Sequence, residues 1–493
     1  MLASWINPII EFALLLGFSL SGAAGLYLMG VRRLWQLLGF AIGFVALLRS
    51  LSYLILDAIG LGNLGIEVWI GAMLAMFSLA VAVGKLEFLK LAGLVSLGSS
   101  AMILIAIGAK YLLDIGERPH TDSSRLVAIA QLILRDGESL SQLDGFFKRG
   151  FAYPALLGIA PPGRILLALT PLIFISLLVL VVGWYLEAAP KLRRWQQVAL
   201  LVGGVSVLTI PMVQISVFYL NSHTLLAIGL AAVAYGVWRH SQLGLDFKKP
   251  EPVGYALIIS GVALATLTRP EGFVLAVLVY LPLLARLGLQ NDWRARGKAW
   301  LPLAVAIIGI SAWIYAFDYQ NPHRWPVQLW LISLIGLTLS AIWLLPAWDR
   351  VRRLSVRLAF ALMLLALGFA ALRNSVPFFE GLRAQAKNLL QGYGEWGLLA
   401  PFAIALLVAI GWRGLSGGQR VLIQTSWLLL VGTVASKLVD GGSIGRLGTT
   451  DSVNRMWLQL LPILIVTIAL GISERFAARS SSVEPARSSA ADS

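Results

Sequence analysis

Long apolar runs constrain this chain more than any other feature of its sequence. Residues 165–186, 200–220 and 301–317 are examples, and their lengths are close to the roughly 20 helical residues needed to cross about 30 Å of hydrocarbon. Hydrophobic residues make up 58% of the chain and charged residues only 13%, whereas an ordinary soluble domain has about 25% charged residues. A water-soluble fold could not bury so much apolar surface. We therefore expect an all-α protein, a polytopic bundle of transmembrane helices.

The apolar runs predict about fifteen transmembrane helices. The first run lacks a basic segment before it and a small-residue cleavage site, so we interpret it as a retained helix and not as a removable signal. The expected helices lie near residues 6–29, 35–58, 65–84, 91–113, 165–186, 198–220, 223–239, 254–268, 273–290, 300–317, 326–347, 358–373, 397–412, 421–438 and 457–473.

The distribution of basic residues predicts the orientation of the chain. The net charge is +15, but Lys and Arg are spread over loops between apolar runs instead of clustering on one soluble face, so nucleic acid is not an expected partner. Alternate short loops, starting with Arg32 and Arg33, hold most of them, whereas the short loops of the other side hold only Arg269 and Arg324. The positive-inside rule then predicts an outer N-terminus and a cytoplasmic C-terminus in a plasma (inner) membrane.

This topology sends three longer segments, residues 114–164, 374–396 and 440–456, to the outer face, where we expect the function to lie. The absence of cysteine excludes disulfides, thiolate metal sites and thiol catalysis. The predicted organisation is an N-terminal four-helix module (1–113), an outer loop (114–164), a transmembrane bundle (165–475) and a polar, disordered cytoplasmic tail (476–493).

The first outer segment contains an amphipathic pattern. Leu126, Ile129, Ala130 and Ile133 recur at the spacing of one helix face, which predicts a short helix along the membrane surface. Asp122 stands at its start. Its carboxylate could simply cap the helix by accepting hydrogen bonds from free backbone amides, and this role does not exclude a catalytic one.

Three motifs together resemble a known group of enzymes. The first is D-S-S-R-L-x-x-I-A-Q-L-I-L-R-D-G, from Asp122, followed by F-A-Y-P-A-L-L; the second is T-R-P-E-G at residues 268–272; the third is D-S-V-N-R-M at residues 451–456. In order, spacing and predicted side they resemble the GT-C superfamily of polyprenyl-phosphate-sugar-dependent membrane glycosyltransferases, over roughly residues 114–475. The resemblance implies that an acidic residue of the first outer loop is the general base and that the sugar is transferred with inversion from a lipid phosphate.

The resemblance also implies residue roles. An acceptor hydroxyl attacks the anomeric carbon, so a carboxylate must accept its proton; Asp122 is the best match, with Glu117 second. The leaving lipid phosphate suits the bidentate fork of arginine, for which Arg455 and Arg269 are the candidates, with headgroup contact or a glutamate partner such as Glu271 as alternatives. His223 and Tyr153 complete the expected substrate-binding set, with an interface role as the alternative for His223.

Two features depart from the superfamily. Four helices precede the first outer loop where one is usual, and the chain has no D-x-D pair, so we assign no metal ligands and leave a divalent metal ion as an open alternative. Membrane lipids, the lipid-linked donor and a glycan, lipid or protein acceptor are the expected partners.

Two other functions compete with a glycosyltransferase. A lipid or glycan transporter should show internal repeats and charged or broken helices at the membrane midplane, but the acidic residues concentrate in one outer loop. A polymerase or ligase of the O-antigen type also has a large outer loop, without an acidic residue heading the first one.

Overall fold

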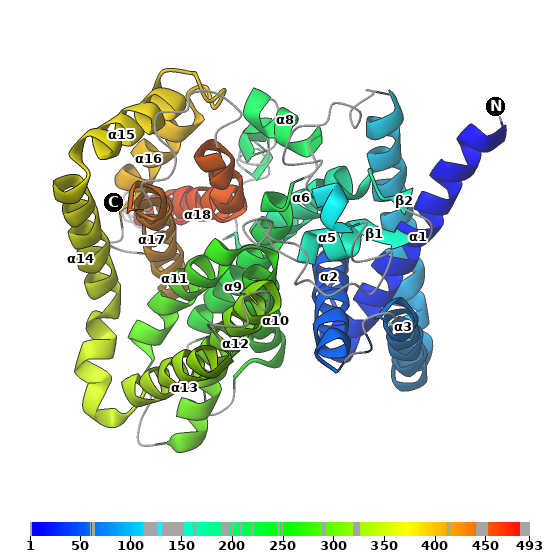
Figure 1. The fold of residues 1–493 in the computed structure, drawn as a ribbon. Coiled ribbons are helices and arrows are strands. Elements are labelled where there is room, and N and C mark those ends of the chain that lie inside the picture. The colour runs from blue at the N-terminus through cyan, green and yellow to red at the C-terminus, as the bar shows by residue number, and fades with distance from the viewer. Residues whose placement is uncertain are drawn as a thin grey trace, which may run out of the picture.

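The computed structural model describes residues 2–59, 61, 65–112, 126–130, 152–160, 164–189, 197–198, 202–204, 206–207, 210–218, 221–243, 247, 250–287, 292–318, 326–411, 415–439 and 452–483. These residues form helices almost throughout, with one short antiparallel strand pair (Figure 1). The elements are α1 (Leu2–Leu28), α2 (Leu34–Ala58), α3 (Gly65–Leu112), α5 (Ala152–Leu157), β1 (Gly158–Ala160), β2 (Arg164–Ile165), α6 (Leu169–Ala188), α8 (Pro211–Phe218), α9 (His223–Gln242), α10 (Pro252–Thr268), α11 (Pro270–Arg286), α12 (Trp293–Asp318), α13 (Pro326–Trp343), η5 (Pro346–Trp348), α14 (Asp349–Arg373), α15 (Ser375–Leu390), α16 (Leu399–Ile410), α17 (Gly417–Val439) and α18 (Ser452–Val483).

Within the described residues, seven helical segments are long and apolar enough to span a membrane. They lie in α1, α2, α3, α6, α12, α14 and α18, and three shorter apolar helical segments lie in α10, α13 and α16. The prediction of a helical membrane protein is thereby supported. The count of about fifteen spans is not reached by this criterion.

The segment Glu67–Lys110 of α3 is 44 residues long, about twice the length that crosses a bilayer. Its backbone is interrupted at Lys85, where φ is 45° and ψ is −128°. This break falls between the two helices predicted near residues 65–84 and 91–113. Lys85 therefore marks the turn between two helical arms, each of spanning length.

Apolar side chains project outward from the bundle. On α14 the side chains of Leu365, Phe369 and Leu372 are 69%, 62% and 88% exposed. Only 17% of the candidate span Pro346–Arg373 is buried inside the protein. An outward apolar face of this length would be unfavourable in water and is the normal lipid-facing surface of a transmembrane helix.

The helices form a continuous assembly with α9 near its centre. α1, α2 and α3 pack together at one side, and α2 and α3 also contact α6. α9 packs against α10, α11, α17 and α18, while α14, α15 and α16 lie at the other side (Figure 1). This arrangement places the helix that carries His223 in the middle of the protein.

Close packing of α9 against α10 depends on glycine. A Cβ atom on Gly236 would lie 2.4 Å from the carbonyl oxygen of Gly254, and one on Gly261 would lie 2.6 Å from the carbonyl oxygen of Gly229. Small residues let the backbones of two membrane helices approach closely. Because the hydrophobic effect does not drive helices together in lipid, the van der Waals contacts of this close packing stabilise the pair.

One set of helix ends meets at Glu187, at the end of α6. Arg33, just before α2, and Arg239, near the end of α9, both pair with the Glu187 carboxylate. Arg239 Nη2 also lies 2.9 Å from Glu251 Oε1, at the start of α10. Gln242 at the end of α9 donates to Ser416 Oγ, just before α17, over 2.8 Å. We call this set of ends the arginine-rich end; the predicted topology places all of them on the same side.

Three stretches differ from the sequence expectations. α14 begins at Asp349 and not near residue 358, because Arg352 is buried and donates to the carbonyl oxygens of Leu284 and Leu287 over 2.7 and 2.8 Å. The expected outer segment 374–396 contains the helix α15. α18 continues to Val483, so its end is helical within the segment expected to be disordered, and residues 484–493 lie outside the described residues.

Candidate functional site

The start of α9 is held by a side-chain cap. Asn221 Oδ1 accepts hydrogen bonds from the backbone amides of His223 and Thr224 over 3.1 and 3.4 Å, and Asn221 Nδ2 donates to the carbonyl oxygen of Ser216 over 2.7 Å. The first amides of a helix have no partner within the helix, and an Asn side chain satisfies them well. The cap fixes the positions of Ser222 and His223.

The T-R-P-E-G motif forms the junction between α10 and α11. Arg269 has extended backbone, with φ of −157° and ψ of 149°, because the ring of the following Pro270 disfavours the helical conformation at the preceding residue. A Cβ atom on Gly272 would lie 1.9 Å from the carbonyl oxygen of Ala265. Proline therefore breaks the helix, and glycine allows the two resulting helices to pack closely.

Arg269 bridges two helix starts. Its Nε lies 2.5 Å from Glu271 Oε1 in the first turn of α11, and its Nη1 donates to Ser222 Oγ over 3.0 Å. The side chains of Arg269 and Glu271 are only 9% and 14% exposed. The glutamate partner that the sequence offered as an alternative role for Arg269 is therefore present, and the pair holds the guanidinium beside the start of α9.

His223 connects the start of α9 to α18. Its Nδ1 lies 2.6 Å from Gln459 Nε2, and both side chains are buried. An amide nitrogen donates hydrogen bonds, so in this arrangement Gln459 Nε2 donates and His223 Nδ1 accepts.

Arg455 lies in the first turn of α18, one helical turn before Gln459. Residues four apart lie on the same helix face, and Arg455 is 8% exposed. Its guanidinium is thus held at the end of α18 whose Gln459 contacts His223.

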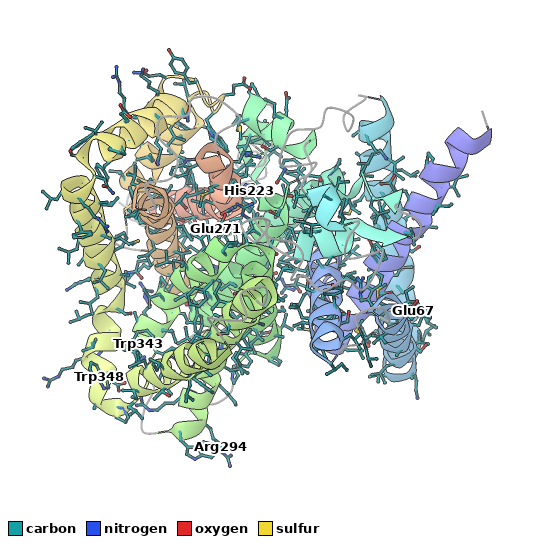
Figure 2. All side chains as sticks on the ribbon, in the orientation of Figure 1. Glu67, His223, Glu271, Arg294, Trp343 and Trp348 are labelled. Atoms are coloured by element: carbon teal, nitrogen blue, oxygen red, sulfur yellow. The ribbon has the colours of Figure 1, made fainter. Side chains whose placement is uncertain are left out.

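Hydrogen bonds join Arg269 to Glu271 and Ser222, and Gln459 to His223, while Arg455 lies one turn before Gln459 on α18. We call Ser222, His223, Arg269, Glu271, Arg455 and Gln459 the Arg269–Arg455 cluster. It lies at the helix ends opposite the arginine-rich end, and Figure 2 shows His223 and Glu271 near each other beside α18. The cluster contains two arginines, both largely buried. Buried guanidinium groups suit a phosphate or carboxylate ligand.

Three of the four predicted substrate-binding residues therefore come together, namely His223, Arg269 and Arg455. Tyr153 has a different environment. It is fully buried in α5, and within the described residues the one hydrogen bond of its hydroxyl is to Thr170 Oγ1, over 2.5 Å. Burial raises the pKa of the Tyr153 hydroxyl, which stays neutral and ties α5 to the start of α6.

The two candidate acids, Asp122 and Glu117, lie outside the described residues. Of the predicted surface helix, residues 126–130 are described and helical, with Leu126, Ile129 and Ala130 buried. These are positions that the apolar pattern placed on one helix face. Residues 126–130 are thus helical as predicted, while the location of this helix along the membrane surface and the role of Asp122 stay predictions.

A resident metal ion has no ligand set among the residues described. No group of three or more His, Asp or Glu side chains lies close enough there to hold one. The outer loop, with Glu117 and Asp122, is not covered by that statement.

Sequence reasoning missed Ser222, Gln459 and Asn221 as members or supports of the site. Ser222 and Asn221 immediately precede His223, and Gln459 follows Arg455 by one turn, so their proximity to a candidate residue was one available signal. A buried amide or hydroxyl inside an apolar run must find a hydrogen-bond partner. That requirement singles out such residues without identifying the partner.

No model of a protein family matches the chain, and neither the curated proteins nor the solved structures contain a match.

Proposed function

We propose that this protein is an inverting membrane glycosyltransferase that transfers a sugar from a polyprenyl-phosphate donor to an acceptor at the outer face of a plasma membrane. The proposal includes a fold like that of the GT-C superfamily, about fifteen transmembrane helices, an outer N-terminus and a cytoplasmic C-terminus. The observation that carries it is the Arg269–Arg455 cluster. Arg269, His223 and Arg455 belong to different helix ends, and all three lie at the same end of the bundle.

The cluster suits the phosphate of the donor. Charge grows on the lipid phosphate as its bond to the sugar breaks, and a guanidinium can bind two phosphate oxygens at once. Arg269 is already oriented by Glu271 and Ser222, so little reorganisation is needed when the phosphate binds. The partly water-excluded surroundings of both arginines strengthen the electrostatic attraction.

The remaining chemistry is assigned to the first outer loop. An acceptor hydroxyl oxygen forms a bond to the anomeric carbon while the bond from that carbon to the phosphate oxygen breaks. Asp122 accepts the hydroxyl proton, with Glu117 as the alternative base. The polyprenyl phosphate leaves with the bonding electron pair, and Arg455 and Arg269 stabilise its charge.

The surface of the bundle and the distribution of its charges agree with a donor that is embedded in the membrane. Outward apolar faces on α3 and α14 are what lipid contact requires. The arginine-rich end gathers the basic residues that the positive-inside rule assigns to the cytoplasm. The Arg269–Arg455 cluster then faces the outer leaflet.

Binding of undecaprenyl phosphate to purified protein tests the proposal. We expect binding that is much weaker for undecaprenol, which lacks the phosphate, and about tenfold weaker for Arg455→Lys, because lysine keeps the charge but loses the bidentate fork. Arg373→Lys, an exposed arginine at the end of α14, is the matched control and should bind like the wild type.

Transfer is measured with the same protein in vesicles that contain undecaprenyl-phosphate-linked hexoses or pentoses. Transfer of the sugar to an acceptor by the wild type supports the glycosyltransferase assignment, provided that Arg455→Lys loses transfer and donor binding in parallel. Equal affinity of wild type and Arg455→Lys for undecaprenyl phosphate would remove Arg455 from the phosphate site. Movement of lipid between leaflets without sugar transfer would favour a transporter.

A further inference from the structure

A second region with binding chemistry lies away from the Arg269–Arg455 cluster. A cavity of about 990 Å³ opens between α11, α14, α16 and α17. Three arginines line it: Arg286, the last residue of α11; Arg357 on α14; and Arg420 near the start of α17. The cavity belongs to the arginine-rich end, since Arg286 Nη1 donates to the carbonyl oxygen of Gly417 over 2.8 Å, beside the Ser416 that binds the end of α9.

The arginines of this cavity carry uncompensated positive charge. Arg286 and Arg420 donate to neutral backbone carbonyls, those of Gly417 and Leu415, each over 2.8 Å. Over the stretches that the structure describes, none of the three forms an ion pair with a carboxylate, and no Asp or Glu lines the cavity. Arg420 lies close enough to Arg286 for the two like charges to repel. An anion between them would relieve that repulsion.

The rest of the cavity wall is apolar, apart from Gln424. Phe360, Val408 and Ile423 are among its members, and Leu407 lines both this cavity and a second pocket whose lining side chains are all apolar. The second pocket runs between α16 and α18. The region therefore has arginines in the first cavity and an apolar pocket next to it. A phospholipid has the same arrangement, with a charged headgroup followed by apolar acyl chains.

We propose that this cavity binds the phosphate headgroup of an anionic phospholipid, with Arg286, Arg357 and Arg420 around the phosphate and an acyl chain along α16. Basic pockets between membrane helices on the cytoplasmic side bind anionic headgroups, and anionic lipids are enriched in that leaflet. The volume is in the range of specific ligand sites. The proposal does not depend on the glycosyltransferase assignment, because it uses other residues at the opposite end of the bundle.

The apolar wall favours a lipid over free phosphate as the source of the anion. A free phosphate would leave that wall without a partner, whereas the acyl chain of a lipid supplies apolar atoms that pack against it. Arg286, Arg357 and Arg420 are exposed residues, so the headgroup can reach them from the membrane surface.

The test is native mass spectrometry of the full-length protein in detergent, titrated with phosphatidylglycerol or with phosphatidylcholine, which has no net charge. We expect one phosphatidylglycerol to bind at least about tenfold more tightly than phosphatidylcholine. Arg357→Gln should remove most of this preference, and Arg357→Gln combined with Arg420→Gln should abolish it. Arg357 makes no hydrogen bond or ion pair with other described residues, so the single variant is expected to fold; a thermal unfolding scan checks this.

Arg350→Gln is the matched control, because Arg350 is exposed on the same helix and does not line the cavity. It should keep the wild-type preference. Equal binding of both lipids to the wild type, or equal loss in Arg350→Gln and Arg357→Gln, would overturn the proposal. Displacement of bound phosphatidylglycerol by inorganic phosphate at comparable concentration would overturn it in favour of a soluble anion.

Discussion

The Arg269–Glu271 pair allows a prediction in which stability and binding change in opposite directions. Glu271→Gln removes the negative charge nearest Arg269 and keeps the length of the side chain. Arg269 Nε and Glu271 Oε1 are 2.5 Å apart, and the two side chains are 9% and 14% exposed. An exposed ion pair contributes about 0–1 kcal/mol, and breaking a fully buried one costs about 3–5 kcal/mol. The Arg269–Glu271 pair is largely buried, and Arg269 keeps its hydrogen bond to Ser222 in the variant. We therefore expect Glu271→Gln to lower the free energy of unfolding by about 1–3 kcal/mol.

The same substitution should strengthen phosphate binding. It raises the net charge of Arg269, Arg455 and residue 271 by one unit, because a carboxylate becomes a neutral amide. At an effective dielectric constant of 20, the interaction energy of two unit charges 10 Å apart is about 1.7 kcal/mol. The affinity for undecaprenyl phosphate should therefore rise by about tenfold.

Two measurements on one protein sample test this reasoning. Thermal unfolding in detergent, followed by tryptophan fluorescence, should show a lower midpoint for Glu271→Gln, and titration with undecaprenyl phosphate should show tighter binding. Glu380→Gln, an exposed glutamate on α15, should change neither. An unchanged midpoint would refute the structural role of the pair. Weaker binding would refute the assignment of Arg269 to the phosphate, since it would mean that Glu271 itself helps to hold the donor.

Three further predictions concern the base, the orientation and the packing. Asp122→Asn should lower sugar transfer roughly 10²- to 10⁴-fold with little loss of stability, because Asn keeps the capping ability; a near wild-type rate in the vesicle assay would exclude Asp122 as the base. In this cysteine-free chain, Ala386→Cys on α15 should react with an impermeant thiol reagent in intact cells and Arg294→Cys, at the start of α12, only after permeabilisation; the reverse pattern would invert the topology. Gly236→Val should destabilise the protein by at least about 1–3 kcal/mol through a clash with the backbone of α10, whereas Gly368→Val, with no atom within 4 Å of its added Cβ, should not; equal thermal midpoints for the two variants would disprove the tight contact.

Local periodicity and turn chemistry account for the parts of the fold that the sequence predicted. Runs of apolar residues set the helices, and the predicted spans near residues 6–29, 35–58 and 223–239 correspond to α1, α2 and α9. The break around Lys85 and the bend at Arg269 follow from short-range signals, a basic polar interruption in one case and Pro270 in the other. Such features depend on neighbours within a few residues, so a single sequence reveals them.

The length of a helix was less predictable where a charged side chain is buried within it. Hydropathy alone started the predicted helix near residue 358, after the arginines of residues 350–357, yet α14 includes them because Arg352 finds carbonyl partners on α11 and just after it. A buried arginine is costly without such partners and tolerable with them. The partners belong to another helix, and no property of residues 350–357 reveals their presence.

The sequence by itself determined that the chain is an assembly of membrane helices, and it picked out His223, Arg269 and Arg455 as polar residues at predicted helix ends on one side. Only the tertiary structure decided that these three converge, that Tyr153 is instead bound to Thr170, and that Arg286, Arg357 and Arg420 surround one cavity. Helix formation depends on hydrogen bonds four residues apart, which local composition governs. Convergence depends on which helix faces pack together, and that choice is made by contacts such as Gly236 against Gly254 between segments that are remote in sequence.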